Sequence, residues 1–245
     1  MVSLTFWFLT WELDEMLSYL DTMLLSISDS QARLQKRVDE MAIGLENDRK
    51  EELYEAYADE YHELVEDFPR RLRRNFIVNW YSLVEDRLVR ICDELRHARP
   101  EWESVEFNRS IHDAGRFLRQ VVGYEIDQAH WREVHFVRQA RNQIVHANSR
   151  LPCSKRPYQD SEGQCRQIDL NGERRYLRAE PNFGIYLMKH SMLRLSNQSC
   201  VIDPSPDYCR YLVEFAKEFF ERIYVGTGIL PTEWADRQPR TLPFA

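Results

Sequence analysis

The chain has 245 residues and a formal net charge of −7, and 30% of its residues are charged. A chain of this length can bury one substantial core. Its 8 glycines, together with many charged residues, favour helices over a many-stranded sheet. The negative total excludes a polycation that binds nucleic acid with its whole surface, and no apolar run reaches the length needed to cross a membrane.

The cysteines and the first nine residues bear on the compartment. The 5 cysteines show no C-x-x-C spacing and therefore indicate no zinc site. Residues 1–9 are apolar but lack a basic segment and a small-residue cleavage site, which favours the first turn of a packed helix over a secretion signal. We therefore expect a cytoplasmic protein with reduced thiols that uses no metal and no cofactor.

Two helices are predicted at the start of the chain, over residues 10–45 and 49–67. The first has an apolar stripe at helical spacing, and residues 28–30 mark a bend or break in it. The second has an acidic outer side, formed by Glu51, Glu52, Glu55, Asp59, Glu60, Glu63, Glu66 and Asp67. A solvated face is the simplest interpretation of this side, and a surface for a basic partner, or a guard over a basic site, is the alternative.

A helix boundary is predicted at Pro69, because proline suits a first helical turn. A strong apolar stripe and several arginines then continue to about residue 97, and Pro100 ends the helix. After a linker, Ser110 suits the N-cap of a helix that Gly123 stops.

The chain changes character after residue 146. Residues 150–173 are polar, contain prolines and glycines, and predict a loop. Residues 183–195 alternate in part and predict a small hairpin or extended arm. A final amphipathic helix is predicted from Pro206 to Gly226, with its aromatic stripe in the core.

The predicted fold class is therefore mainly α. It comprises a long helical extension at 1–66, a helical-bundle domain at 67–226 and a weakly ordered tail at 227–245. The region 150–200 is a loop or hairpin insertion before the last helix of that domain.

The stretch most informative about function is 138–146, RQARNQIVH, at the end of a helix predicted to begin near Gln128. At about 100° per residue, one side of this helix carries Val134, Val137, Arg141, Ile144 and Val145. Arg141 is therefore expected on the buried face, where an arginine is costly unless an anion meets it. A carboxylate from a neighbouring helix and a phosphate would both satisfy it, and spacing alone favours the carboxylate.

Residues 141–146, RNQIVH, resemble the R-x4-H motif of the HEPN superfamily, including the polar residue that many members carry after the arginine. Residues 79–92, NWYSLVEDRLVRIC, resemble the core HEPN helix that packs against the motif helix. The resemblance implies a HEPN-like helical bundle with metal-independent endoribonuclease activity, in which Arg141 and His146 are catalytic and Asn142 supports them. It also implies a homodimer with a composite site for the RNA substrate. Many members act as toxins or in antiviral defence, controlled by an antitoxin, a ligand or a sensor protein.

The residue types suit this chemistry. Histidine transfers protons near neutral pH, and the planar guanidinium of arginine can hold two phosphate oxygens as charge builds up. On a regular helix, however, Arg141 and His146 point about 140° apart. Either the helix loosens near His146, or motif helices from two copies line one cleft.

Two further residues have expected roles, and two other functions stay open. Arg138 is expected to contact the RNA backbone or an acid across the dimer, and Glu85 to be the structural partner of a motif arginine. Asn148 stands where some HEPN toxins have a tyrosine that a partner enzyme modifies, so we do not expect that control here. The alternative function is a non-catalytic helical module that binds RNA or protein. A metal-dependent hydrolase ranks last, because no H-E-x-x-H spacing occurs.

Overall fold

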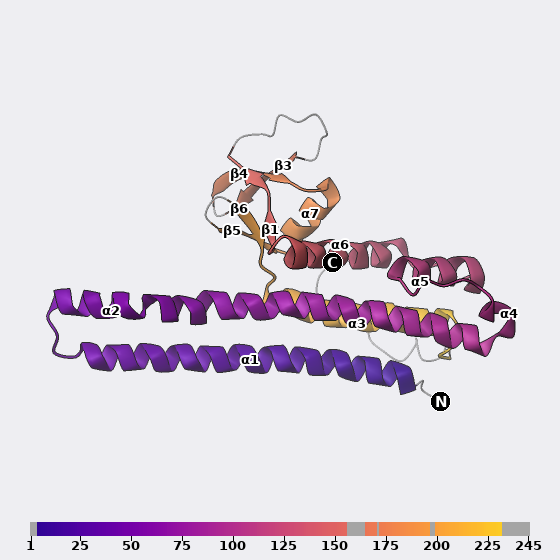
Figure 1. Ribbon diagram of the computed structural model, residues 1–245, viewed down its shortest axis with the longest axis horizontal. Helices are drawn as coiled ribbons and strands as arrows, with labels where there is room; N and C mark the ends of the chain where they lie inside the picture. Colours follow the sequence, from indigo (N-terminus) through magenta and orange to yellow (C-terminus); the bar gives the residue numbers. More distant parts are fainter. Residues whose placement is uncertain (1–3, 156–164, 171, 197–198, 232–245) are drawn as a thin grey trace.

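The computed structural model describes residues 4–155, 165–170, 172–196 and 199–231. The protein is mainly helical, as predicted, with long helices in its body and a small insertion of strands on one side (Figure 1). Across these ranges, none of the helices combines the length and the apolar character that crossing a membrane requires.

Two long helical rods lie antiparallel (Figure 1). The first is α1, Leu4–Ala42; the second joins α2, Asn47–His62, the π-helix η1, Glu63–Asp67, and α3, Phe68–Ala98. The break that the sequence allowed at residues 28–30 does not occur, because α1 continues through them. The Ser30 hydroxyl donates back to the Ser26 carbonyl at 2.9 Å.

The boundary predicted at Pro69 is confirmed as the start of α3, which begins at Phe68 with Pro69 in its first turn, but it is no break in the rod. The backbone keeps helical angles from His62 to Phe68, and the Phe68 N–H donates to the Glu63 carbonyl five residues earlier. Because this wide turn reorganises the hydrogen bonds just ahead of Pro69, the rod accommodates a residue that has no N–H to donate.

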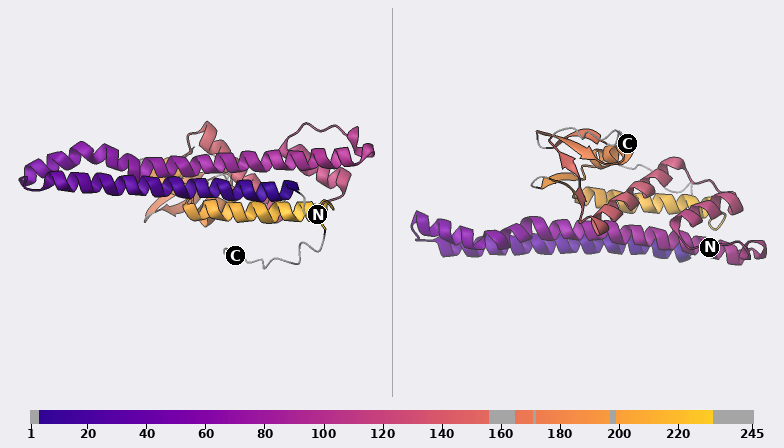
Figure 2. Two further views of the ribbon diagram at one scale, coloured as in Figure 1. Left: turned by 90° about the horizontal axis from the view of Figure 1, so that it is seen from below. Right: turned by 45° about the horizontal axis from the view of Figure 1, so that its top comes forward.

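The core lies where α1 and α3 meet α8, Pro206–Gly226. Figure 2 shows α8 running alongside these two helices. Trp80 of α3 is fully buried and donates its indole N–H to the Leu212 carbonyl of α8 at 2.9 Å. Leu9 and Leu13 of α1 are equally buried, so the start of α1 belongs to this core. The domain boundary expected at residue 66 falls inside η1.

The middle of the chain forms shorter helices, which pack on α3. They are α4, Pro100–Glu103, within the expected linker, α5, Ile111–Phe117, the π-helix η2, Leu118–Val122, and α6, Gln128–His146. The predicted starts of α5 and α8 are confirmed, because Ser110 accepts the Asp113 N–H and Ser205 accepts the Tyr208 N–H, each at 3.1 Å.

The insertion has more regular structure than the sequence predicted. It contains β1 (Arg150–Leu151), β2 (Cys153–Ser154), β3 (Cys165–Leu170), β4 (Glu173–Arg178), α7 (Pro181–Lys189), β5 (Leu193–Ser196) and β6 (Ser199–Ile202). They form two antiparallel three-stranded sheets, ordered β1-β6-β5 and β2-β4-β3.

The loop predicted over 150–173 is therefore wrong for β1, β2 and β3, while residues 156–164 lie outside the described part. The hairpin predicted over 183–195 is wrong in its first part, which belongs to the helix α7. It is confirmed only in β5, which pairs with β6. The strands escaped prediction because β1 and β2 are two residues long and β3 and β4 are largely polar. They are stabilised by pairing and by single buried side chains such as Ile168 and Leu177.

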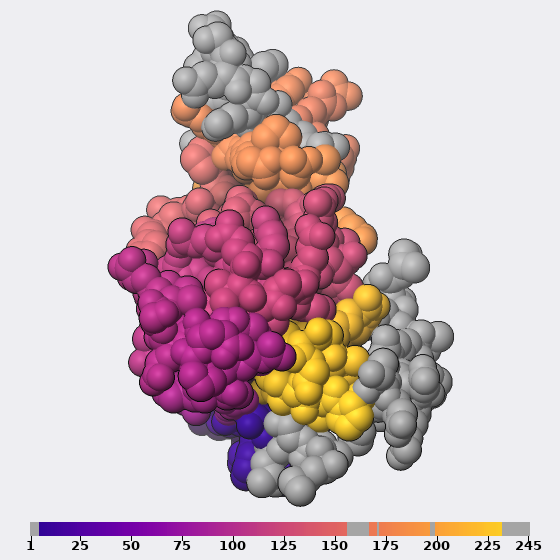
Figure 3. All heavy atoms as spheres, turned by 90° about the vertical axis from the view of Figure 1, so that its right-hand side faces the viewer, coloured from indigo at the N-terminus to yellow at the C-terminus, as the bar shows by residue number. Residues whose placement is uncertain are grey.

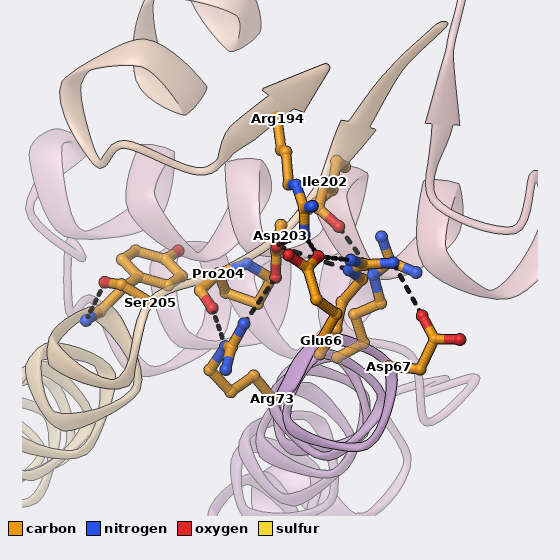
Figure 4. Close-up of polar contacts among 11 residues, drawn as sticks. Glu66, Asp67, Arg73, Arg194, Ile202, Asp203, Pro204 and Ser205 are labelled. Atoms are coloured by element: carbon orange, nitrogen blue, oxygen red, sulfur yellow. Dashed lines mark hydrogen bonds and ion pairs between the residues drawn. The ribbon is translucent and has the colours of Figure 1, made fainter. Parts of the chain in front are cut away.

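An ion cluster ties the insertion to the second rod at the π-helix (Figure 4). Asp203, which follows β6, pairs with Arg73 at 2.9 Å and with Arg70 at 3.5 Å. Glu66 of η1 pairs with Arg70 at 2.8 Å and with Arg194 of β5. We call these five residues the Asp203 cluster. Since three arginines surround two carboxylates, charge pairing fixes where the π-helix meets the hairpin.

Candidate functional site at the end of α6

The helix α6 begins where the sequence predicted. Asp127 caps it, accepting the backbone N–H groups of Ala129 at 2.8 Å and His130 at 3.1 Å. Val137 and Ala140 are fully buried against the body. Figure 3 shows the segment 100–146, in magenta to pink, as a band between the insertion and α8 in yellow.

The buried face of α6 differs in part from the prediction. Arg141 is half-buried, but Val145 is 47% exposed. The reason is that the buried face centres near Ala140, and Val145 lies about 140° around the helix from it. The motif arginine therefore sits at the edge of the core, with its head towards the surface.

The Arg141 guanidinium turns towards Asn142. Its Nη1 donates to the Asn142 Oδ1 at 3.0 Å, while its Nε is buried and has no hydrogen-bond partner. Across the described ranges, no ion pair involves Arg141 or Arg138. Several arginines elsewhere pair with carboxylates, as Arg87 does with Glu12 and Arg90 with Asp86, although others, such as the exposed Arg132, have no ion pair among the described residues. The motif thus holds positive charge that no described carboxylate neutralises.

Tyr81 of α3 lies in the electrostatic reach of both motif arginines. The pKa of Tyr81 is raised to about 12, first by burial and then by the Glu85 charge, whereas Arg138 and Arg141 act to lower it. Glu85 is half-buried one turn after Tyr81, and no ion pair in the described part joins it to either arginine. Its assigned role as a structural partner stays a prediction.

Arg138 contacts a histidine from another helix. Its Nη1 meets the His112 Nε2 of α5, and its Nε is buried without a hydrogen bond. The His135 Nε2 lies 2.9 Å from the Gln139 Nε2, and burial, followed by the charges of Arg138 and His112, lowers the His135 pKa. The sequence interpretation missed His112 and His135, since only the packing of α5 on α6 brings them together.

A polar stripe connects these residues to the motif histidine. Arg132, His135, Gln139, Asn142 and His146 recur every three or four positions and so share one face of α6. Near its start, Arg119, Arg132 and His135 line a cleft of about 310 Å³. The stripe therefore runs the length of the helix and ends at His146.

His146 is exposed and is the last residue of α6. The helix stays regular up to it, so the loosening that would bring it towards Arg141 within one chain does not occur. Asn148 and Ser149 then take left-handed conformations, with φ of 49° and 63°. Ser149 donates its N–H to the Gln143 carbonyl and accepts the Ile202 N–H, both at 2.9 Å. The helix end beside His146 is thus fixed to β6.

The described residues contain no group of three or more histidine, cysteine, aspartate or glutamate side chains placed to hold a metal ion. Comparison with protein-family models, with curated proteins and with solved structures found no match to this chain.

Proposed function

We propose that this protein is a metal-independent endoribonuclease of the HEPN type, with its site at the C-terminal end of α6. The observation that carries the proposal is the uncompensated guanidinium of Arg141, held against Asn142 on the helix that ends at an exposed His146. A cation without a described carboxylate partner is suited to an anionic ligand. The RNA phosphate is that ligand in our proposal.

Each residue has a defined part in the reaction. One His146 takes the proton from the ribose 2′-hydroxyl, whose oxygen attacks the phosphorus. A water molecule protonates the departing 5′-oxygen, so the products are a 2′,3′-cyclic phosphate and a free 5′-hydroxyl. Arg141 stabilises the extra negative charge on the phosphoryl oxygens, and Asn142 orients the Arg141 guanidinium. Arg138 contacts the RNA backbone.

The geometry of α6 supports a site that is shared between two copies of the chain. Because the helix is regular from Arg141 to His146, the two side chains leave it about 140° apart. A homodimer that brings two motif helices together supplies Arg141 from one copy and His146 from the other to a single phosphate. In the cell, the proposed role is that of a toxin or antiviral-defence effector, controlled by an antitoxin or sensor protein.

The test is RNA cleavage by the purified full chain. We expect His146→Ala and Arg141→Ala each to lower the rate by at least about a hundredfold, as loss of a proton-transfer or charge-stabilising group does. Asn142→Ala should cost less than either. Activity should persist in a chelator, and induced expression of the wild type, but not of His146→Ala, should slow growth.

The matched control is His97→Ala, which removes another exposed histidine near a helix end. It should cleave like the wild type. Full activity of folded His146→Ala would remove the assignment, and loss of activity in the chelator would favour a metal-dependent hydrolase.

A second candidate is a non-catalytic module of the same fold that binds RNA or protein. The separation of Arg141 and His146 within one chain favours it if the protein is monomeric. RNA binding that depends on Arg138 and Arg141 without any cleavage would identify this function.

A further inference from the structure

The distal parts of the two rods form an acidic arm, which we define as residues 25–67. Figures 1 and 2 show it projecting beyond the rest of the molecule. It holds 13 of the 40 acidic residues but only 5 of the 33 lysines and arginines, which gives a net charge of −8. Since the whole chain carries −7, the arm accounts for the entire negative balance and the remainder is close to neutral.

An apolar groove runs along this arm between α1 and α2. It has a volume of about 510 Å³, and its apolar lining comprises Leu34, Val38, Tyr54, Ala58, Tyr61 and Val65, besides the Tyr57 ring. Tyr54 is 45% exposed, and Tyr61 and Val65 are each 38% exposed. Positions 54, 58, 61 and 65 follow the spacing of four, three and four residues that gives one helix a seam for another helix.

Hydrogen bonds hold two tyrosine rings of the groove in place at the surface. The Tyr54 hydroxyl donates to Asp39 at 3.0 Å, and the Gln31 amide donates to the Tyr61 hydroxyl at 3.2 Å. These contacts fix the edges of both rings and leave their faces in the groove. The apolar surface is therefore preformed.

One edge of the groove is a row of unpaired acids. Glu51, Glu55 and Asp59 are exposed on α2 and lie about 60–140° around the helix from Tyr54. Within the described residues, none of the three forms an ion pair. At the opposite edge of the groove, in contrast, Arg37 pairs with Glu60 at 3.4 Å and covers the Tyr57 ring. The unneutralised charge thus borders the open groove.

We propose that the groove binds an amphipathic helix from another protein, with apolar side chains on Tyr54, Tyr61 and Val65 and with lysines or arginines over the row of acids. The charge selects this occupant. A second copy would bring an arm of equal negative charge, and RNA phosphates or anionic lipid head groups would be repelled. This inference is independent of RNA cleavage, because the arm contains no residue of the proposed site.

Fluorescence anisotropy with the full chain tests the proposal. The probe is a labelled synthetic helix of about 20 residues with leucine at its seam positions and lysine or arginine elsewhere, beside a scrambled peptide of the same composition. We expect the patterned peptide to bind at least about tenfold more tightly than the scrambled one, and its binding to weaken as salt screens the charges.

Two variants locate the binding. Ala58→Gln with Val65→Gln makes the groove polar, and Glu51→Gln, Glu55→Gln and Asp59→Asn together neutralise its edge. Each should weaken binding at least about tenfold. The control, Leu25→Gln with Ile43→Gln, removes exposed apolar side chains of the arm outside the groove and should bind normally.

The acid-row variant alters no apolar contact, so it tests the proposal even if the groove variant unfolds. Equal binding of both peptides, or unchanged binding by the acid-row variant, would overturn the proposal. So would a groove variant that lowers the sedimenting mass of the protein, since that outcome places a second copy in the groove.

Discussion

At the scale of single residues, Glu133 shows how the motif helix is held in place. It lies on α6 and accepts a hydrogen bond from the Tyr186 hydroxyl of α7 at 2.5 Å. The Tyr186 hydroxyl also contacts that of Tyr208 on α8. Burial raises the Glu133 pKa above its usual 4.5, although hydrogen bonds from Tyr186 and Tyr211 act in the opposite direction. One carboxyl group thereby joins three helices around the site.

This shift predicts a pH dependence of stability. Because the folded state raises the Glu133 pKa, it binds the proton more tightly than the unfolded chain does. The stabilising contribution is therefore complete below the unfolded pKa and is lost as pH rises through the folded value. Chemical denaturation from about pH 4 to about pH 7 should show that the unfolding free energy of the wild type falls relative to that of Glu133→Gln as pH rises. A difference that is flat, or that shifts the other way, would contradict this assignment.

At the scale of elements, the π-helix and the Asp203 cluster set the position of the insertion. The cluster joins η1 and α3 to β5 and to the turn before α8 (Figure 4). Ser149 and Ile202 then connect the same hairpin to the end of α6. A continuous chain of contacts therefore runs from the second rod to the residues beside His146.

Removing the central carboxylate should destabilise this connection. The Asp203 side chain is only 12% exposed, so Asp203→Asn leaves partly buried arginines without their shared negative charge and should cost about 3 kcal/mol in the free energy of unfolding. Asp86→Asn is the matched control, because the Arg90–Asp86 pair is about half exposed and should contribute less than about 1 kcal/mol. Thermal and urea denaturation measure both. Equal losses of unfolding free energy in the two variants would show that the Asp203 cluster stabilises the protein no more than an exposed ion pair does.

At the scale of the whole molecule, the proposed site and the acidic arm occupy different parts of the protein. The arm projects away from α6 (Figure 1), so a partner on the arm leaves the end of α6 accessible. The proposed nuclease instead needs a second copy of the chain close to His146.

Mixing two inactive variants tests whether the site is shared. If one copy supplies Arg141 and the other His146, a heterodimer of Arg141→Ala and His146→Ala keeps one intact site. An equal mixture of exchanging subunits should then regain about a quarter of the wild-type cleavage rate. A site contained within one chain would give no recovery, which is the result that rules out the composite arrangement.

Local patterns were enough to predict much of the helical framework. Ser110, Gly123 and Ser205 bound helices where expected, because caps and stops depend on side chains within a few positions of them. The R-x4-H spacing likewise placed Arg141 and His146 on α6. In contrast, the short strands β1 and β2 and the positions of His112 and Tyr81 near the motif depend on segments distant in sequence.

The sequence by itself therefore determined the helical class, most helix starts and the residues that belong to the candidate site. Those properties arise from hydrogen bonds and apolar spacing over one or two turns. Only the tertiary structure decided that a π-helix precedes Pro69 within a continuous rod, that the insertion forms two sheets, and that Arg138 and Arg141 have no described carboxylate partner. The physical reason is that charge pairing and strand pairing join distant parts of the chain, and their outcome depends on the packing of the whole molecule.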